Sequence, residues 1–314
     1  MICLKVENLI FSVSEGKILA EVILGTANFG NNYGVLNSKN GGRQTVTAQE
    51  AINIIKYCKS VGINRFDTAL TYGSAMLILE EYIKIDPEIE VLNKISWVGG
   101  SSLNFAKYLK ELIGLIQRPI GAVTTLVQWH NWEGNLSDLE RMEEIQAKFK
   151  TSHNLRFGVT TYGVKNAELA ADSPYIDSVQ FEYNVLNQSV IQALSNKNLH
   201  RTCHYAIRSI LLQGLLPSDN FGSYKISPKL FDAITQFQTI ANAWGLTPLE
   251  VAIRSMLNYS INSDLVIGAT SIQELDQVLA SLFKGPLPSE LFEQLLQLRK
   301  YDVALADPRN WNIS

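Results

Sequence analysis

The sequence lacks several features that would assign it to a specialised class of protein. Its 314 residues include only three cysteines, Cys3, Cys58 and Cys203, which show neither metal-site spacing nor a disulfide framework. The net charge of −3 and the pI of about 5.9 show that the chain does not have the excess of basic residues typical of nucleic-acid-binding proteins. No uninterrupted apolar run approaches the roughly 18 residues that a membrane helix needs. We therefore expect neither a nucleic-acid partner nor a membrane partner.

The sequence does contain enough apolar residues for a large core. Hydrophobic residues make up 46% of the chain and charged residues 18%, which is typical of globular proteins. Lys5 and Glu7 interrupt the first apolar residues too early for a secretory signal, so we expect a cytoplasmic protein. Because a (β/α)₈ barrel fills about 200 to 400 residues as one domain, and no linker is visible, residues 1–314 are predicted to form a single domain.

Short apolar segments alternate with longer segments of helical period along the whole chain. Eight segments rich in β-branched residues are candidate strands: 22–26, 64–69, 91–96, 123–130, 155–160, 178–183, 202–207 and 264–269. Helical segments between them, such as 48–61, make the pattern one of repeated strand–helix units, which predicts a parallel sheet. Right-handed crossovers can close such a sheet into a (β/α)₈ barrel. Extra helices are expected before the last strand, at 229–244 and 248–259, and near the C-terminus, at 288–301.

Four polar residues lie near the carboxyl ends of three consecutive candidate strands, where barrel enzymes keep their active sites. Asp67 lies near the end of the second strand and Tyr72 follows that strand, Lys94 lies in the third strand, and His130 ends the fourth. Each residue has an ordinary structural explanation when taken alone, such as a helix cap or a snorkelling lysine. Burying Lys94 and Asp67 near a barrel axis is nevertheless costly unless they pair. Together the four predict an active site.

This set of groups suits hydride transfer to or from a carbonyl carbon. Tyr72 can protonate the oxygen of the product, although an unperturbed phenol has a pKa of about 10. A nearby Lys94 ammonium would lower the pKa of Tyr72, and Asp67 would keep Lys94 charged and oriented. A neutral His130 would hydrogen-bond to the carbonyl oxygen. In the oxidative direction the same tyrosine would act as the base.

Several short motifs, in their order and spacing, resemble the aldo-keto reductase family over most of the chain. The matching stretches are LGT at 24–26, FDTA at 66–69 with YG at 72–73, NK at 93–94, His130, FGVT at 157–160, VQFEYN at 179–184 and QGLL at 213–216. The resemblance implies a (β/α)₈ barrel that binds a nicotinamide dinucleotide without a Rossmann domain, and no Gly-x-Gly-x-x-Gly motif opens a helix here. It also implies that Asp67, Tyr72, Lys94 and His130 are the catalytic residues, with Tyr72 the proton donor.

The resemblance implies a set of residues that hold the cofactor. It comprises Gly25, Thr26, Asp67, Thr160, Thr161, Gln180, Arg208, Ser209, Leu211, Gln213, Gly214, Gly268, Ser271 and Glu274. Thr160 and Thr161 stand where the family usually has a Ser-Asn pair, whereas Gln180 retains the expected amide. Arg208 stands where many members stack a tyrosine on the nicotinamide ring. Its planar guanidinium group could take over that role, with a surface salt bridge as the alternative.

The region predicted to bind adenosine departs from the family pattern. Members that prefer NADP often place a basic residue here, yet no lysine or arginine lies between Val266 and Leu282. Glu274 would repel a 2′-phosphate, or accept a hydrogen bond from a ribose hydroxyl or an adenine amine. We expect the nearest cation, Lys284, to point elsewhere. The resemblance therefore implies NADP(H) as the default cofactor, with NAD(H) as a close alternative.

Loop residues rich in aromatic rings and amides predict the substrate pocket. The candidates are Asn28, Phe29, Tyr33, Trp97, Asn131 and Trp132, with Trp129 expected to face away from His130. Indole rings beside amides suit a sugar-like carbonyl substrate, although core packing is an alternative for the tryptophans. A similarity to a bacterial subgroup associated with surface polysaccharides points the same way.

Other functions remain open at this stage. A protein that binds the cofactor but serves as a regulatory or weakly active member of the fold would carry the same four residues. A Schiff-base aldolase using Lys94 is disfavoured, because the adjacent Asp67 raises the pKa of the amine that must be neutral. Metal catalysis has little support, since the four histidines show no convergent ligand spacing.

Overall fold

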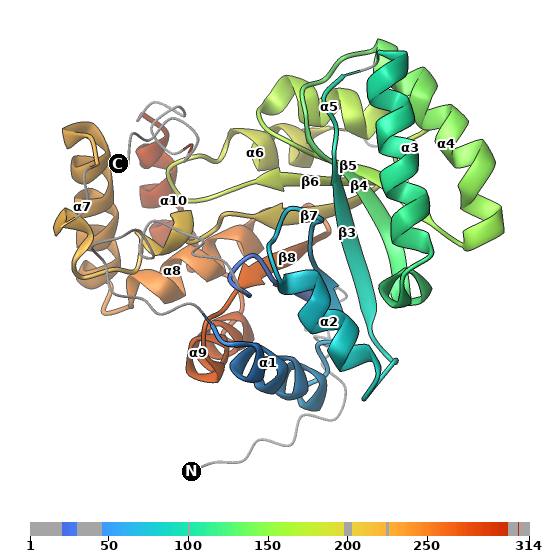
Figure 1. The fold of residues 1–314 in the computed structure, drawn as a ribbon. Coiled ribbons are helices and arrows are strands. Elements are labelled where there is room, and N and C mark those ends of the chain that lie inside the picture. The colour runs from blue at the N-terminus through green and yellow to red at the C-terminus, as the bar shows by residue number, and fades with distance from the viewer. Residues whose placement is uncertain are drawn as a thin grey trace.

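The structure, a computed structural model, describes residues 21–29, 46–99, 101–197, 203–223, 226–300 and 307 of the chain. Eight parallel strands close into a barrel in the order in which they occur along the sequence (Figure 1). They are β1 Val22–Gly25, β2 Arg65–Asp67, β3 Glu90–Ser96, β4 Thr124–Trp132, β5 Arg156–Thr161, β6 Ser178–Glu182, β7 His204–Arg208 and β8 Ser263–Gly268. The pairing of β8 with β1 closes the sheet. The predicted (β/α)₈ barrel is confirmed.

Helices connect successive strands around the barrel (Figure 1). They are α1 Ala48–Ser60, α2 Ala75–Ile83, α3 Ser102–Ile116, α4 Ser137–His153, α5 Val164–Asp172, α6 Ser189–Asn196 and α9 Ile272–Phe283. The additional helices are α7 Pro228–Ala243 and α8 Pro248–Ser255, which precede β8, and α10 Ser289–Leu296, which packs against α7. Across the described residues, no helix is both long enough and apolar enough to cross a membrane.

The helices begin where the sequence supplies capping residues. Thr47 caps α1, since its hydroxyl accepts from the amide of Glu50 at 3.2 Å while the Glu50 carboxylate accepts from the amide of Thr47 at 2.8 Å. Such a reciprocal capping box satisfies two amides that a helix end leaves without partners. Thr247 caps α8 in the same position before a proline, as expected from the sequence.

Side chains inside the barrel form three layers, because alternate residues of a strand face opposite sides of the sheet. On β3, Glu90, Leu92 and Lys94 belong to successive layers. The middle layer is an apolar cluster of Ile23, Leu92, Leu126, Ala206 and Val266. This cluster separates two polar layers, one at each end of the barrel.

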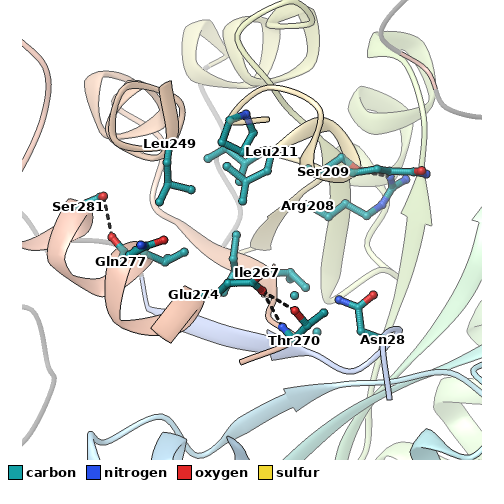
Figure 2. Close-up of a pocket in the computed structure, with 18 of the residues that line it drawn as sticks. Asn28, Arg208, Ser209, Leu211, Leu249, Ile267, Thr270, Glu274, Gln277 and Ser281 are labelled. Carbon is teal, nitrogen blue, oxygen red and sulfur yellow. Dashed lines mark hydrogen bonds between the residues drawn. The ribbon is translucent and has the colours of Figure 1, made fainter. Parts of the chain in front are cut away.

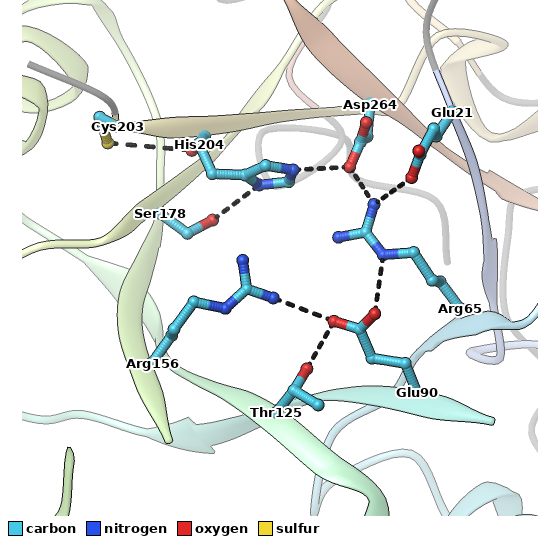
Figure 3. A network of polar contacts seen from close by, with 9 residues as sticks. All are labelled: Glu21, Arg65, Glu90, Thr125, Arg156, Ser178, Cys203, His204 and Asp264. Carbon is cyan, nitrogen blue, oxygen red and sulfur yellow. Dashed lines mark hydrogen bonds and ion pairs between the residues drawn. The ribbon is translucent and has the colours of Figure 1, made fainter. Parts of the chain in front are cut away.

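The polar layer at the amino-terminal end is a network of ion pairs, here called the floor network (Figure 3). Its members with ionisable side chains are Glu21, Arg65, Glu90, Arg156, His204 and Asp264. Arg65 contacts Asp264, and its Nη1 lies 3.0 Å from Glu21 Oε2. Glu90 pairs with Arg65 at 3.4 Å and with Arg156 at 2.9 Å. Each of these side chains is therefore engaged by another member of the network.

Candidate active site

Asp67 and Lys94 form a buried ion pair in the polar layer at the carboxyl-terminal end of the barrel. Their side chains are only 4% and 1% exposed. Lys94 Nζ contacts Asp67 Oδ1 and also donates to the carbonyl oxygen of Thr68 at 3.2 Å. Gln180 of β6 donates from Nε2 to Asp67 Oδ2 at 2.8 Å. Both oxygens of Asp67 are thus held, one by a cation and one by an amide, and the pairing expected from the sequence is present.

Tyr72 lies beside this ion pair. Lys94 Nζ is 5.2 Å from the centroid of the Tyr72 ring, and the His130 ring meets the same ring edge-on at a centroid distance of 6.1 Å. A turn after β2 fixes Tyr72, because its amide donates to Ala69 at 3.0 Å and its carbonyl accepts from the amide of Ala75 at 3.0 Å. The four residues predicted to form one site therefore lie together, although they come from three different strands and the following loop.

The pKa of Tyr72 departs from the expectation. Burial raises the pKa of the phenol above its ordinary value, the charge of Asp67 raises it further, and Arg208 partly opposes the rise. The sequence led us to expect a lowered pKa because of Lys94. That expectation is wrong in this structure, where Asp67 pairs with the lysine and burial has the largest effect. The phenol is consequently protonated at neutral pH, as a proton donor must be.

His130 is neutral, as expected. Burial lowers its pKa to about 3, with further contributions from the positive charges of Lys94 and Arg208. A neutral imidazole can donate one hydrogen bond and accept another. His130 can therefore orient an oxygen atom beside Tyr72 without adding a charge to the site.

A cavity of about 730 Å³ extends from Asp67 and Tyr72 along α9 as far as Lys284, whereas Lys94 and His130 are not among its lining residues (Figure 2). Twelve of the residues predicted from the sequence line it: Gly25, Asn28, Asp67, Tyr72, Gln180, Arg208, Ser209, Leu211, Gln213, Gly214, Gly268 and Glu274. The loop after β7 forms one wall, with left-handed backbone at Ser209, Leu212 and Gln213. Such strained conformations often occur at functional sites.

Four residues predicted to bind the cofactor do not line this cavity. The Thr26 hydroxyl donates to the carbonyl of Asp67 at 3.0 Å, and the Thr161 hydroxyl donates to the carbonyl of Trp132 at 2.8 Å. Thr160 accepts from the amide of Asn131 at 2.8 Å. These buried hydroxyls stabilise neighbouring strand ends, and their part in cofactor binding stays a prediction. Ser271 instead caps α9, accepting from the amide of Glu274 at 3.2 Å.

Most residues predicted to bind the substrate lie elsewhere. Trp97 and Trp132 both donate from their indole nitrogens to Asp138, at 2.8 and 3.2 Å, and Phe29 is fully buried in the core. These three predictions are wrong, because the aromatic rings pack into the layer between barrel and helices. Trp129 stacks on Trp97 and faces away from His130, as expected. Of the other candidates, Asn131 is exposed, and Tyr33 lies outside the described residues.

Contacts within the end of α9 define the other end of the cavity. The Glu274 carboxylate accepts from the amide and the hydroxyl of Thr270 at 2.8 and 2.9 Å, so its negative charge is fixed at the start of the helix. Lys284 also lines the cavity, where we expected it to point elsewhere, and its Nζ lies 2.6 Å from Glu250. Gln277, Val278 and Ser281 complete this wall.

Sequence reasoning missed Gln277, Ser281 and Lys284, although a signal was present. Counted from Glu274, residues 277, 278 and 281 recur at the spacing of one helical face. Polar residues on that face would have indicated that α9 presents it to a solvent-filled cavity rather than to the core.

The shape and donor groups of the cavity fit a dinucleotide. Gly25 and Gly268 are register partners at the ends of β1 and β8, so bare backbone forms part of the wall. A Cβ atom on Gly268 would lie 3.1 Å from Asn28 Nδ2, which would narrow this strip. Gln180 and the α9 residues Glu274, Gln277 and Ser281 line the same cavity, so one extended molecule could contact both sets.

Comparisons with known proteins agree with this geometry. The sequence profile of the Aldo/keto reductase family matches residues 21–300. The chain belongs to the aldo/keto reductase family. Its fold is similar to the crystal structure of the Pseudomonas aeruginosa protein PA4992, classed provisionally as an aldo-keto reductase, with a TM-score of 0.60 at 15% identity over 86% of this chain and 92% of that one. A comparison with curated proteins gave no match.

Membership makes the chain a nicotinamide-dependent carbonyl oxidoreductase in general terms. Among the described residues of this aldo/keto reductase, no group of three or more His, Cys, Asp or Glu side chains could hold a metal ion.

Proposed function

We propose that the protein reduces an aldehyde, a ketone or an aldose to the alcohol, with Tyr72 as the proton donor. The observation that carries this proposal is a protonated phenol at one end of a large cavity, beside a buried Lys94–Asp67 ion pair. The apolar barrel layer below the pair excludes water from that side.

Each residue of the site has a separate task. Tyr72 gives its proton to the oxygen as negative charge develops on it. Lys94, held by Asp67, places a positive charge near the phenol and stabilises the phenolate that remains. Neutral His130 donates a hydrogen bond to the substrate oxygen and fixes its direction. Asp67 and Gln180 act through Lys94 and the cavity wall rather than on the substrate.

The cofactor that completes the reaction is a nicotinamide dinucleotide, which supplies a hydride when bound. Gln180 and Arg208 would hold the nicotinamide end and the face of α9 the adenosine end. Between the two family cofactors, we propose NAD(H) over the default NADP(H). The fixed carboxylate of Glu274 repels a 2′-phosphate, and Lys284, the cation at this end of the cavity, is paired with Glu250.

The sugar-derived part of the substrate prediction loses one of its two supports, the indole rings. The indole rings that suggested a sugar lie in the core, with their nitrogens bonded to Asp138. Asn28 and Ser209 are the polar side chains near the reactive end that remain available to contact a hydroxyl group. The proposal therefore covers small carbonyl compounds without specifying a sugar.

The test removes the phenol oxygen of Tyr72 in the site and, as a control, the phenol oxygen of Tyr108 in the core. We expect Tyr72→Phe to lower the turnover of reduced nicotinamide on a panel of carbonyl compounds about 100-fold or more. Tyr108→Phe is the matched control, because Tyr108 is a buried phenol packed against Trp97 and Trp129 in the core. The Tyr108→Phe variant should keep the turnover of the wild type. Equal rates for the wild type and Tyr72→Phe would overturn the proposal. Tight cofactor binding without turnover would favour a regulatory role instead.

A titration tests the choice of cofactor. The wild type should bind NAD(H) more tightly than NADP(H), and Glu274→Gln should reduce that difference because it removes the negative charge. If NADP(H) binds more tightly to the wild type, the argument from Glu274 fails while the proposed reaction stands.

A further inference from the structure

Arg208 forms part of the cavity wall at the Tyr72 end, and several contacts fix the plane of its guanidinium group. Nη2 donates to the carbonyl of Thr161 at 3.0 Å, and Nη1 lies 3.4 Å from the hydroxyl of Ser209. The central carbon of the group lies 4.1 Å from the centroid of the Tyr162 ring. The cation is therefore held against the Tyr162 ring and lies in the cavity wall, where Figure 2 shows Arg208 beside Ser209.

The proposed reaction defines where a nicotinamide ring must lie. A carbonyl oxygen that receives the proton of Tyr72 is within hydrogen-bond reach of the phenol, and its carbon is one bond away. Reacting atoms in a productive complex lie about 3 to 3.5 Å apart. The ring must consequently occupy the end of the cavity lined by Tyr72, Gln180 and Arg208.

The positive charge of Arg208 already acts on the groups at this end. It contributes to the lowered pKa of His130, after burial and Lys94, and it opposes the rise in the pKa of Tyr72. Glu182, whose carboxylate accepts from the amide of Gly163 at 3.0 Å, lies within the same field. Burial raises the pKa of Glu182, and the positive charge of Arg208, its register partner on β7, opposes that rise.

We propose that Arg208 makes the protein bind the reduced nicotinamide cofactor in preference to the oxidised one. This inference rests on the proposed function. The reduced ring is neutral and the oxidised ring carries a positive charge, so a fixed guanidinium beside the ring repels only the oxidised form. An aromatic side chain in the same place would do the opposite, because the face of an aromatic ring attracts a cation.

The preference has a consequence for the direction of the reaction. During reduction, the carbonyl carbon gains a hydride from the cofactor, its oxygen gains the proton of Tyr72, and a positive charge appears beside Arg208. Repulsion between Arg208 and the oxidised ring opposes this chemical step. The same repulsion weakens binding of the oxidised cofactor and so favours its release. In a mixture of both forms, the protein is therefore loaded for reduction and is little inhibited by oxidised cofactor.

The experiment compares dissociation constants of the oxidised and the reduced cofactor by calorimetric titration, with no substrate present. In the wild type the reduced form should bind more tightly, and Arg208→Met should lower the ratio of the two constants about tenfold. Arg208→Lys keeps the charge but loses the planar stacking group, so it should weaken binding of both forms and retain most of the ratio.

Lys284→Met is the matched control, since it removes a cation from the far end of the same cavity. The oxidised and reduced cofactors have identical groups at the Lys284 end of the cavity. Lys284→Met should therefore leave the ratio of their dissociation constants unchanged, even if it changes each constant. The inference is overturned if Arg208→Met leaves the ratio of the two dissociation constants unchanged. It is also overturned if Arg208→Lys lowers this ratio as much as Arg208→Met does. Neither result would affect the proposed function. If the wild type binds neither form, the proposed function fails with it.

Discussion

The two ends of the barrel both carry buried charges, yet only one of them has the features of an active site. At the amino-terminal end, Arg65, Glu90, Arg156 and Asp264 satisfy one another in the floor network. At the carboxyl-terminal end, Asp67 and Lys94 form a similar pair, but this pair lies beside a phenol and a cavity of about 730 Å³. A buried ion pair is therefore not by itself a sign of catalysis.

The difference lies in what each charge can reach. The floor network uses its charges to join the starts of six strands or their flanking residues, which is a structural role. The Asp67–Lys94 pair joins only β2 and β3 directly, and its positive charge faces the ring of Tyr72. Variants at the two ends should consequently separate loss of stability from loss of activity.

The largest expected effect is that of Lys94→Met. Among the described residues, it leaves the buried Asp67 carboxylate with the Gln180 amide as its only side-chain partner, so we expect the free energy of unfolding to fall by about 3 to 5 kcal/mol. Turnover per folded molecule should fall about 100-fold or more, because the phenolate of Tyr72 loses its cation. Chemical denaturation and a carbonyl assay measure the two effects. If Lys94→Met is as stable as the wild type and has normal turnover, the proposed difference in role between the two ends of the barrel is wrong.

Arg65→Met is the matched change at the floor. It removes one cation from a pair whose side chains are 11% and 10% exposed, and we expect a loss of about 2 kcal/mol of stability, because Asp264 keeps His204 and Glu90 keeps Arg156. Turnover per folded molecule should be unchanged. A variant that unfolds no more easily but reduces carbonyls poorly would show that the floor takes part in catalysis.

Acid should weaken the floor network through Asp264. Burial opposes the charge of this carboxylate, but contacts with His204 and Arg65 outweigh burial, so its pKa is lowered. A group with a lowered folded pKa contributes stability above its unfolded pKa of about 3.9 and loses it as the pH falls through the folded value. Asp264→Asn should therefore show a smaller decrease in unfolding free energy than the wild type below about pH 4. Identical acid profiles would contradict this role.

The smallest expected effect is on the pH profile of turnover. Because the pKa of His130 is about 3, this residue should not titrate between about pH 5 and 8, and no acid limb should appear there. His130→Gln should lower the rate while leaving the shape of the profile unchanged in that range. An acid limb near pH 6.5 that disappears in His130→Gln would show that the imidazole is charged in the active protein.

The sequence predicts the barrel and the four central residues well for a physical reason. Alternation with period two on β3 places Glu90, Leu92 and Lys94 on one face, and the barrel rule then assigns one end to chemistry. The same alternation puts Arg65, two residues before Asp67, on the same face of β2. It does not predict that Glu21 and Asp264 pair with Arg65, because contacts between strands depend on the strand register.

The residues that sequence reasoning misplaced share a different cause. Trp97, Trp132 and Thr160 occur near strand ends, as site residues do, yet their side chains turn toward neighbouring strands and helices. Trp97 follows β3, so the backbone conformation after that strand decides the direction of its side chain. Trp132 and Thr160 lie within β4 and β5, where hydrogen bonds with Asp138 and Asn131 engage their side chains. The pKa of Tyr72 was misjudged because burial, which sets its direction, follows from packing. The extent of the single domain over residues 1–314 stays a prediction.

A structure of the protein with a nicotinamide dinucleotide and a carbonyl inhibitor tests the central claim most directly. It should place the nicotinamide ring between Gln180 and Arg208, the adenosine beside Glu274 and Gln277, and the inhibitor oxygen within hydrogen-bond distance of the Tyr72 hydroxyl. A dinucleotide bound in the reverse orientation, or outside this cavity, would show that Tyr72 and Lys94 do not serve carbonyl reduction.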